Sequence, residues 1–432
     1  MKTRTALTIA GLFVTGLAFG TQFAQAQAAG SLDTTFGTGG TVTTTFSGQT
    51  VTPIGAVQQS NGDIVVISQF DFQSDAGTGV GVTRYTLAGK LDTTFGTEGS
   101  TFTTFPDIIF QALWFAVQSN GAIVVGGGTA PSDSTLPGAN QGFGLVRFTA
   151  SGALDSTFGT NGLVNTPIGP RTANPGSLLL QPNGQIVMAG LEGGNGEKST
   201  NPDAIPNMVA VARYNTNGSL DTTFGSGGVA LLNNASTLQG ANQLALLTNG
   251  DYLVVSTAFG GPVTAQLSST GVLQSSVTGG TIVNTTPTAF GELDSATLFH
   301  PNGDFIIIQA TGNPNRALSI MGQRFSETAV LDPTFSSAHF TFGGERRSAP
   351  NGIALQSNGQ ILVGGSVSGA SPISGGLARL NANGELDTTF GNGGTLTTDN
   401  AVNGVLVQAD GKIVAVEAVS TDGIALARYL AN

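Results

Sequence analysis

Side chains that could do chemistry are few in this sequence. Of its 432 residues only 9% are charged, two are histidines (His300 and His339), and none is cysteine. A chain without cysteine has no disulfide, thiolate metal ligand or cysteine nucleophile. Two isolated histidines give little material for a metal centre or a Ser-His-Asp triad, and we expect no metal site and no cofactor. Hydrolysis by two carboxylates stays open, because folding alone can bring them together.

The most regular charged pattern is an arginine followed, eight residues later, by an aspartate. In one further copy both positions change together, to Gln266 and Gln274. Losing one member of a partly buried pair costs about 3 to 5 kcal/mol, whereas losing both can be almost neutral, so the joint change indicates contact. We expect structural ion pairs with no catalytic role, formed by Arg84 and Asp92, Arg147 and Asp155, Arg213 and Asp221, Arg324 and Asp332, and Arg379 and Asp387.

These pairs belong to a repeated unit. The phrase Leu-Asp-Thr-Thr-Phe-Gly, with variations, begins at seven leucines that are 53 to 66 residues apart. They are Leu32, Leu91, Leu154, Leu220, Leu273, Leu331 and Leu386. A second phrase, Asn-Gly or Asp-Gly between apolar runs, keeps step with the first. Because this dipeptide between apolar runs is the strongest short-range hairpin signal, we expect seven β-hairpins.

Each unit then continues with a third strand that ends near the arginine, and with a fourth strand rich in threonine or valine, as at 41–45 and 395–398. Four-stranded units repeated seven times, without helical periodicity, predict an all-β fold. We expect a seven-bladed β-propeller of four-stranded antiparallel blades. A linear β-solenoid is the alternative.

The two ends of the repeat array favour a closed ring. The last unit stops after its third strand, at 425–430, and the first phrase of the chain is the one that should come next. We expect residues 40–46 to complete the seventh blade, which removes the exposed edges of an open array. Arg428 has no aspartate after it, so this arrangement predicts an ion pair between Arg428 and Asp33.

The N-terminus has the pattern of an export signal. Basic residues precede an apolar stretch over 5–20, and Ala26 or Ala28 ends a small-x-small cleavage motif. We predict a signal peptide over residues 1–28, a single propeller domain over 29–432, and a secreted or periplasmic protein. An N-terminal membrane anchor is the alternative. After cleavage we expect no membrane insertion, because no further run of 18 apolar residues follows.

The charge balance limits the partners. A formal net charge of −11 and a pI near 4.5 oppose binding to nucleic acid or to an anionic membrane surface. We therefore expect a monomer whose partner, if any, is an extracellular glycan or protein.

The repeated phrases resemble a known family. The stretches are Gln-Pro-Asn-Gly-Gln-Ile-Val at 181–187, Ala-Arg-Tyr-Asn-Thr-Asn-Gly at 212–218 and Leu-Asp-Thr-Thr-Phe-Gly at 220–225. Together they closely resemble the delta-60 repeat of exported bacterial β-propeller proteins. The resemblance covers nearly all of 31–432 and fails mainly in the fourth unit, where Gln266, Gln274 and Val277 depart. It implies architecture and export but no shared catalytic motif, so no family site is carried over.

Two places could hold a ligand. One ring face carries the hairpin turns and the third-to-fourth-strand turns, which are nearly constant in sequence; we call it the constant face. The other carries the second-to-third-strand loops and the connections between blades, and we call it the variable face. Variable loops on a rigid scaffold are where binding residues usually lie. The longest are at 130–141, 191–207 and 343–351. Plain solvated loops are the alternative.

The second place is the mouth of the central channel. Equivalent points on the inner strands are Ile54, Leu113, Gly176, Asn242, Ser295, Asn351 and Asn403. Amides and one tryptophan there would suit hydrogen bonding and stacking with a glycan or peptide. The alternative is that these side chains satisfy strand ends and bind water. The candidate ligand-binding residues are Trp114, Asn242, Gln243, Asp294, Asn351 and Asn403.

These observations favour a binding or scaffolding module that uses the variable face. The alternative is an extracellular carboxylate-dependent glycan hydrolase or lyase with its site at the channel mouth. An enzyme requires two or more ionisable groups that converge with perturbed pKa values, whereas a binder requires only a polar, aromatic-lined surface. A passive cell-surface structural protein, with no preferred face, is a third reading.

Overall fold

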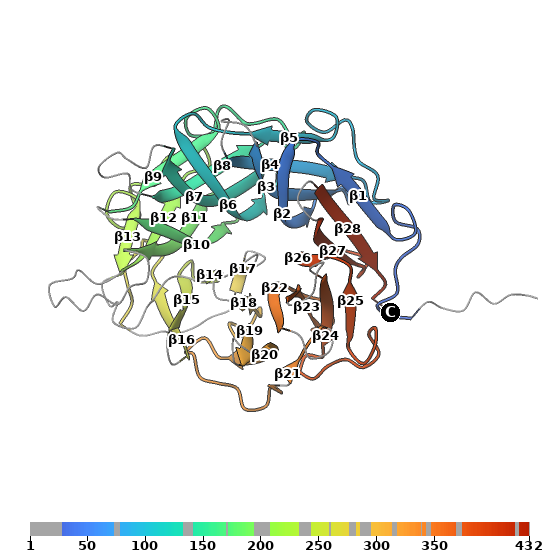
Figure 1. The fold of residues 1–432 in the computed structure, drawn as a ribbon. Helices are drawn as coiled ribbons and strands as arrows, with labels where there is room; N and C mark the ends of the chain where they lie inside the picture. Colours follow the sequence, from blue (N-terminus) through green and yellow to red (C-terminus); the bar gives the residue numbers. More distant parts are fainter. Residues whose placement is uncertain are drawn as a thin grey trace, which may run out of the picture.

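The computed structural model forms a closed ring of seven four-stranded antiparallel sheets (Figure 1). Every regular element in the described ranges is a β-strand. The seven-bladed β-propeller is therefore confirmed. The structure describes residues 28–72, 78–132, 141–169, 172–193, 208–232, 243–258, 261–275, 282–285, 295–312, 318–337, 339–342, 347–368, 374–419 and 423–431.

The first four blades follow one another along the chain. Blade one contains β2 (Gln49–Gln58), β3 (Ile64–Phe72), β4 (Thr78–Tyr85) and β5 (Ser100–Thr103). Blade two contains β6 (Ile108–Val117), β7 (Ile123–Pro131), β8 (Gly142–Phe148) and β9 (Leu163–Pro167). Blade three contains β10 (Ala173–Leu180), β11 (Ile186–Glu192), β12 (Met208–Tyr214) and β13 (Val229–Leu232). Blade four contains β14 (Gln243–Leu247), β15 (Tyr252–Ala258), β16 (Gly261–Leu267) and β17 (Ile282–Thr285).

The last three blades complete the ring. Blade five contains β18 (Ser295–Phe299), β19 (Phe305–Gly312), β20 (Leu318–Phe325) and β21 (His339–Phe340). Blade six contains β22 (Arg347–Leu355), β23 (Ile361–Ser368), β24 (Ser374–Leu380) and β25 (Thr395–Thr398). Blade seven contains β26 (Ala401–Val407), β27 (Ile413–Val419), β28 (Gly423–Tyr429) and β1 (Thr41–Thr45).

Local sequence explains the hairpins that begin each blade. In blade one the side-chain oxygen of Asn61 accepts a hydrogen bond of 3.1 Å from the backbone N–H of Asp63. Gly62 has φ 92°, a conformation that glycine adopts without steric cost. The Asn-Gly dipeptide therefore turns the chain by itself, before any contact with another blade.

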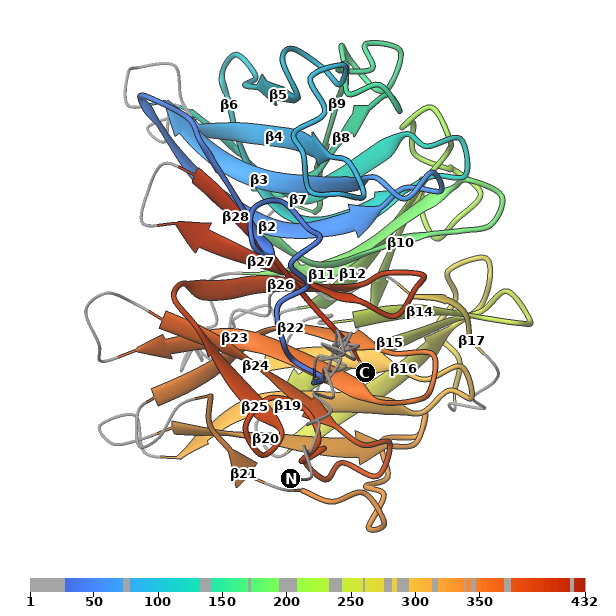
Figure 2. The same ribbon diagram turned by 90° about the vertical axis from the view of Figure 1, so that its right-hand side faces the viewer.

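Strand β1 closes the ring, as the sequence predicts. Thr41 pairs with Ala427 and Thr45 with Gly423, so β1 is the outermost strand of blade seven. The N–H of Asp33 also donates to the carbonyl of Arg428 at 2.7 Å. The blue and red ends of the chain accordingly lie side by side in two views (Figures 1 and 2). The edge that an open array would expose is thereby paired.

The core lies in the seams between blades. Seven apolar clusters each join two neighbouring blades. In β15, for example, Val254 packs toward blade three, whereas Leu253 and Val255 pack toward blade five. Because side chains alternate along a strand, each central strand contributes to two seams, and its near-continuous apolar run follows from this.

Blade four departs from the expected strand order. Five blades run from inner to outer edge in chain order and blade seven takes β1 as its outer strand, but in blade four β17 pairs with the inner strand β14, through Ala245 and Thr285. The prediction of an outer fourth strand is therefore wrong for blade four. The reason is local: in this copy the Phe-Gly turn that returns the chain along the outer edge has degenerated. β16 carries Pro262, which has no N–H to give an outer strand.

Candidate functional site

The arginine–aspartate ion pairs form a belt on the constant face. Nitrogen–oxygen distances in the six pairs are 2.5 to 2.9 Å, and they include the expected pair between Arg428 and Asp33. Each aspartate also accepts hydrogen bonds from the threonine two residues later. The hydroxyl of Thr223, for instance, lowers the pKa of Asp221 to about 2 against the opposing effect of burial. The carboxylates stay ionised at neutral pH.

Each arginine of the belt also reaches the next blade. The guanidinium of Arg213 lies 4.7 Å from the ring centroid of Phe224 and donates to the carbonyl of Ser269 in blade four. The other five arginines likewise lie over the phenylalanine of their own turn. The guanidinium groups donate hydrogen bonds to neighbouring blades and lie over phenylalanine rings, so these arginines are structural connections between blades.

The residue after Asn-Gly or Asp-Gly contacts the aspartate of the belt, a contact that was not predicted from the sequence. Gln185 donates to the carboxylate of Asp221 at 2.7 Å, and the ammonium of Lys412 lies 3.0 Å from that of Asp33. The sequence contains a signal for this contact, because the residue directly follows the Asn-Gly or Asp-Gly of its blade. In blade four the same position, Asp251, takes the place of the lost carboxylate by accepting from the amide of Gln266 at 2.8 Å.

The belt is interrupted between blades four and five. At six seams a backbone N–H that follows the turn phenylalanine bonds to a carbonyl in the next blade, as Gly225 does to Thr270. The described residues contain no such bond at the remaining seam. There the glycine that packs on the phenylalanine in other blades is replaced by Ala329, which has φ 61°. Val277, which stands at the position of the turn phenylalanine in this copy, lies outside the described residues.

The substitution Ala329→Gly should therefore stabilise the protein. An L-residue in the left-handed region costs about 1 to 2 kcal/mol, and glycine removes this strain at some entropic cost in the unfolded chain. We expect a net gain of about 1 kcal/mol in the free energy of unfolding, measured by urea denaturation. The reciprocal control is Gly271→Ala, whose Cβ would lie 2.9 Å from the ring of Phe224 and which should destabilise. A loss of stability in Ala329→Gly would contradict the strain argument.

The predicted channel-mouth positions are β-bulges. Pairing registers shift at Ile54, Leu113, Gly176, Asn351 and Asn403, which are five of the seven equivalent points. The amide of Asn351 donates to the carbonyl of Val402 at 3.1 Å, and that of Asn403 to the carbonyl of Pro53 at 2.9 Å. Both bonds run to the next blade. The side-chain amides of Asn351 and Asn403 therefore connect inner strands of neighbouring blades. This supports the alternative that side chains at these positions satisfy strand ends rather than bind a ligand.

Two other candidates point into the protein. Trp114 is only 5% exposed and packs with Leu178 and Met188 in the seam between blades two and three. The bulge at Leu113 shifts the alternation of side chains along the strand, so the indole of Trp114 enters the core. Trp114 therefore does not lie exposed at the channel mouth, where the sequence predicted a surface for stacking. Gln243 is 1% exposed and donates to the carbonyl of Thr297 in blade five.

The remaining candidates lie outside the described residues. They are Asn242 and Asp294, most of the three long variable-face loops, and residues 1–27 of the predicted signal peptide. Arg347, at the start of β22, is the described basic residue of the third loop, and it is exposed.

Neither histidine is placed for acid–base catalysis. His300 stands where other blades carry glutamine; burial, and then the nearby Arg324, lower its pKa. The Nδ1 atom of His339 lies 3.0 Å from the hydroxyl of Ser319 on the outer wall of blade five. Within the described ranges no three histidine or acidic side chains come together as a metal site, and no helix has the length and apolarity needed to cross a membrane.

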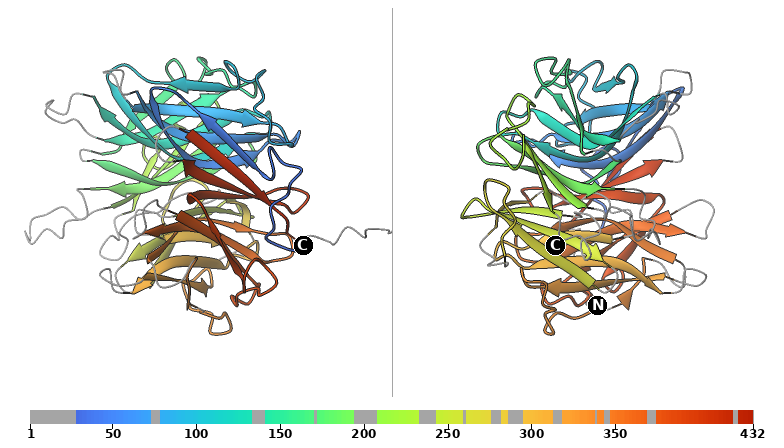
Figure 3. Two further views of the ribbon diagram at one scale, coloured as in Figure 1. Left: turned by 45° about the vertical axis from the view of Figure 1, so that its right-hand side comes forward. Right: turned by 90° about the vertical axis from the view of Figure 1, so that its left-hand side faces the viewer.

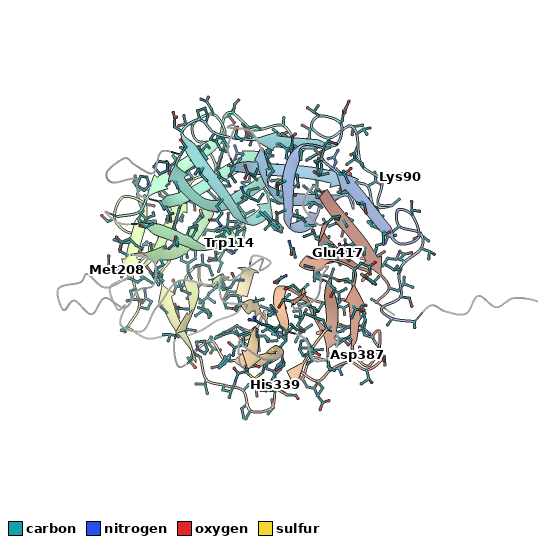
Figure 4. All side chains as sticks on the ribbon, in the orientation of Figure 1. Lys90, Trp114, Met208, His339, Asp387 and Glu417 are labelled. Atoms are coloured by element: carbon teal, nitrogen blue, oxygen red, sulfur yellow. The ribbon has the colours of Figure 1, made fainter. Side chains whose placement is uncertain are left out.

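A buried glutamate is the chemically most distinctive group, and the sequence analysis missed it. Glu417 lies on β27, is 5% exposed, and accepts a hydrogen bond of 3.1 Å from the amide of Asn400 (Figure 4). Burial raises its pKa to about 7, and the negative charge of Asp399 adds to this. Burial and the two acids also raise the pKa of Tyr429. The available signal was one acid inside the apolar run 413–419.

This cluster sits at the variable-face end of the seam between blades six and seven. Asp399 is exposed and Asn400 is half-buried, so the two carboxyl groups differ in environment. Because burial raises its pKa to about 7, Glu417 can hold a proton near neutral pH. Such a pair has the elements of a general acid and a carboxylate.

A separate groove lies on the outer wall of the ring, with a volume of about 540 Å³. It is lined by Gly169, Gly225, Ser226, Val229, Ala230, Leu231 and Gly271. Five of these residues belong to β13 of blade three and the turn before it, Gly271 to the turn after β16 in blade four, and Gly169 to blade two. The lining is apolar and backbone, without an ionisable side chain, so the groove offers packing but no reactive group.

Fold and belt together define a β-propeller protein. Four segments of the chain match the model of a β-propeller family described as "Domain of unknown function (DUF5122) beta-propeller", at residues 59–95, 118–158, 204–224 and 356–390. Each segment contains the arginine–aspartate phrase of its blade (one, two, three and six), and those of blades one, two and six also contain the Asn-Gly hairpin. No curated protein matches the sequence.

Solved structures with similar folds are distant. A glucose dehydrogenase is 10% identical, with a TM-score of 0.38, over 74% of this chain and 99% of that chain. A Trichoderma reesei enzyme of carbohydrate-active family AA12 is 14% identical, with a TM-score of 0.35, over 92% and 97%. A Hadza microbial sialidase is 8% identical, with a TM-score of 0.41, over 82% and 74%. Similarities at this level carry no information on ligand or reaction.

Proposed function

We propose that this protein is an exported binding or scaffolding module of the delta-60 repeat type, which contacts an extracellular glycan or protein through its variable face. The observation that carries the proposal is the engagement of the constant face. There the aspartates, arginines and asparagines of the repeated phrases bond to each other and to the next blade. Groups engaged in this way are unavailable to a ligand, and variable loops on a rigid scaffold are where binding residues usually lie.

The test compares matched charge deletions on the two faces. Purified protein is screened on glycan and peptide arrays, and the best hit is titrated by calorimetry. Arg347→Gln removes an exposed cation from the variable face, and Lys90→Gln removes one from the constant face. Asp399→Asn and Glu385→Gln form the corresponding acidic pair.

We expect at least one variable-face variant to weaken binding about tenfold and both constant-face variants to stay within about twofold. All four side chains are exposed, so the variants should melt like the parent protein. Equal weakening by Lys90→Gln, or no saturable hit on either array, would overturn the proposal.

A second candidate, a carboxylate-dependent glycan hydrolase or lyase, is favoured by the pair of Glu417 and Asp399. In this reading Glu417 donates the proton and Asp399 is the second carboxylate. Polysaccharide turnover should then fall as pH rises through about 7, the pKa of Glu417. Turnover should also be lost in Glu417→Gln. Activity that Glu417→Gln leaves intact would exclude this site.

A further inference from the structure

The outer edge of β16 has no partner strand in the described part of the chain. In the other six blades the third strand pairs on its outer side, as Val211 does with Ala230 and Leu377 with Leu396. The equivalent residue in blade four is Thr264. Its described pairing is with Val255 of β15, on the inner side.

The backbone of Thr264 points toward this open edge. The carbonyl of Gln266 accepts from the N–H of Gln274 on the outer side of the strand. Because backbone groups of residues two apart point the same way, the N–H and C=O of Thr264 also face outward. The next outward residue, Pro262, offers a carbonyl but no N–H.

Exposure supports the same conclusion. Pro262, Val263 and Thr264 are half-buried, whereas the equivalent residues 209–211 of blade three are fully buried under β13. Apolar side chains nearby are also open to solvent: Leu231 on the neighbouring β13 is 42% exposed, and Val272 in the turn after β16 is 60% exposed. Figure 3 (right) presents the side of the ring that carries β13 and β16.

The chain itself shows how such an edge is filled. Blade seven receives its outer strand, β1, from a segment almost 400 residues away, and Val42 of that strand packs against the seam between blades seven and one. The outer strands of blades one, two, three and six are four or five residues long and that of blade five is two, and in β1 and β25 an aliphatic residue lies between threonines. A short, non-contiguous segment is therefore sufficient to complete a blade.

We propose that the outer edge of β16 is a docking site for an extended segment of a partner protein, which adds antiparallel as the fourth strand of blade four. The segment would be short, uncharged, and alternate aliphatic with hydroxyl residues. Its backbone would pair with the N–H and C=O of Thr264 and donate to the carbonyl of Pro262. This inference is independent of the variable-face proposal, since it concerns the outer wall of the ring.

A single extended segment fits this position better than a second ring. β16 is the outermost strand of blade four, and no outer fourth strand covers it in the described residues. The edge of this blade therefore lies one strand spacing, about 4.8 Å, closer to the ring axis than the outer strands β13 and β21 of the flanking blades. A thin strand can enter that step, but the whole blade of another copy meets the flanking strands first. In an edge-to-edge pair of two β16 strands centred on Thr264, Pro262 would also face Gln266 and could donate no hydrogen bond to it, and the carbonyl of Gln266 already accepts from the N–H of Gln274.

The first experiment measures amide exchange at single residues in the free protein. We expect the Thr264 amide to exchange at least about tenfold faster than the amide of Val211, because the latter is bonded within a complete blade. Equal protection of the two amides would show that another part of the chain already fills the edge, and would overturn the proposal.

The second experiment adds a model strand. The probe is a fluorescein-labelled peptide with the sequence of residues 39–48, which contains β1. We expect saturable binding in fluorescence anisotropy, and protection of the Thr264 amide on saturation. The control is the same peptide N-methylated at the amide opposite the carbonyl of Thr264, which removes one of the two donors that face the edge; methylation of the adjacent, outward-facing amide should have no effect.

The edge-facing methylation should weaken binding about tenfold or more. On the protein side, Thr264→Lys places a charge on the edge, a natural means of blocking strand addition, and should weaken binding similarly. No saturation up to about 1 mM peptide would overturn the proposal. So would protection of Thr264 that rises with protein concentration alone, together with a dimeric mass, because the occupant would then be a second copy.

Discussion

Arg428→Met should destabilise the protein by about 3 to 5 kcal/mol, the largest effect we expect from a single substitution away from the apolar core. Arg428 is 3% exposed and Asp33 is 4% exposed. Without the guanidinium, the buried carboxylate keeps only Lys412 as a charged partner. The carbonyl of Leu87 in blade one also loses its donor, and the ring face of Phe36 its cation. The seam at which the two ends of the chain meet is thus weakened on both sides.

Two controls separate ring closure from the general cost of breaking an ion pair. Arg324→Met breaks the equivalent pair in blade five, where both side chains are more than 20% exposed, and should cost less. The double variant Arg428→Gln, Asp33→Gln places at these positions the residue type that blade four has at Gln266 and Gln274, and should recover part of the loss because neither the guanidinium nor the carboxylate is left without the other.

Urea denaturation with an unchanged slope measures these differences. Arg428→Met should also increase proteolysis of the N-terminal segment, because β1 is held by this seam. If Arg428→Met costs no more than Arg324→Met, the closure of the ring rests on the β1–β28 ladder alone.

Glu417→Gln should change how stability depends on pH. The folded pKa of Glu417 is about 7, against an ordinary value of 4.5. Since this pKa is raised, the native state holds the proton more tightly than the unfolded chain does. The stability that the protonated group contributes is therefore complete below about pH 4.5, and it is lost as pH rises to 7 and beyond.

The difference between the folded pKa of about 7 and the ordinary value of 4.5 corresponds to about 3 kcal/mol in the free energy of unfolding at pH 8. Glutamine is neutral at every pH and can still accept from Asn400. We therefore expect Glu417→Gln to match the parent protein near pH 4.5 and to exceed its stability by up to about 3 kcal/mol at pH 8.

The measurement is a series of urea melts between pH 4.5 and 8. Glu385→Gln, at an exposed acid on the constant face, is the control and should leave the profile unchanged. Asp399→Asn should produce a small change in the direction of Glu417→Gln, because it removes the nearby charge. Parallel profiles for Glu417→Gln and the parent protein would show that the carboxyl is ionised in its site without cost.

Much of the fold could be predicted from the sequence because the signals are local and repeated. Asn-Gly turns set each hairpin, and the eight-residue spacing between arginine and aspartate identified side chains that meet across a tight turn. Arg428, which no aspartate follows, identified the closing contact with Asp33, because the equivalent arginine is paired in five other blades and a buried charge requires a partner.

The candidate site was predicted less well, for reasons that particular residues make clear. A one-residue bulge at Leu113 turned Trp114 from the channel into a seam, and no local signal marks a bulge. Asn351 and Asn403 occupy the inner strands as expected, but their amides bond to carbonyls of blades that are distant in sequence. Glu417 was overlooked because its pKa depends on burial between two blades.

The sequence by itself determined the number of blades, their hairpins and the closure of the ring, because each depends on residues close together in the chain or on a pattern that seven copies repeat. The tertiary structure was needed to show which polar groups bond between blades, that Glu417 is buried, and that the fourth strand of blade four lies at the inner edge. These features depend on the packing of one blade against the next, where a single degenerate copy has no repeat to report it.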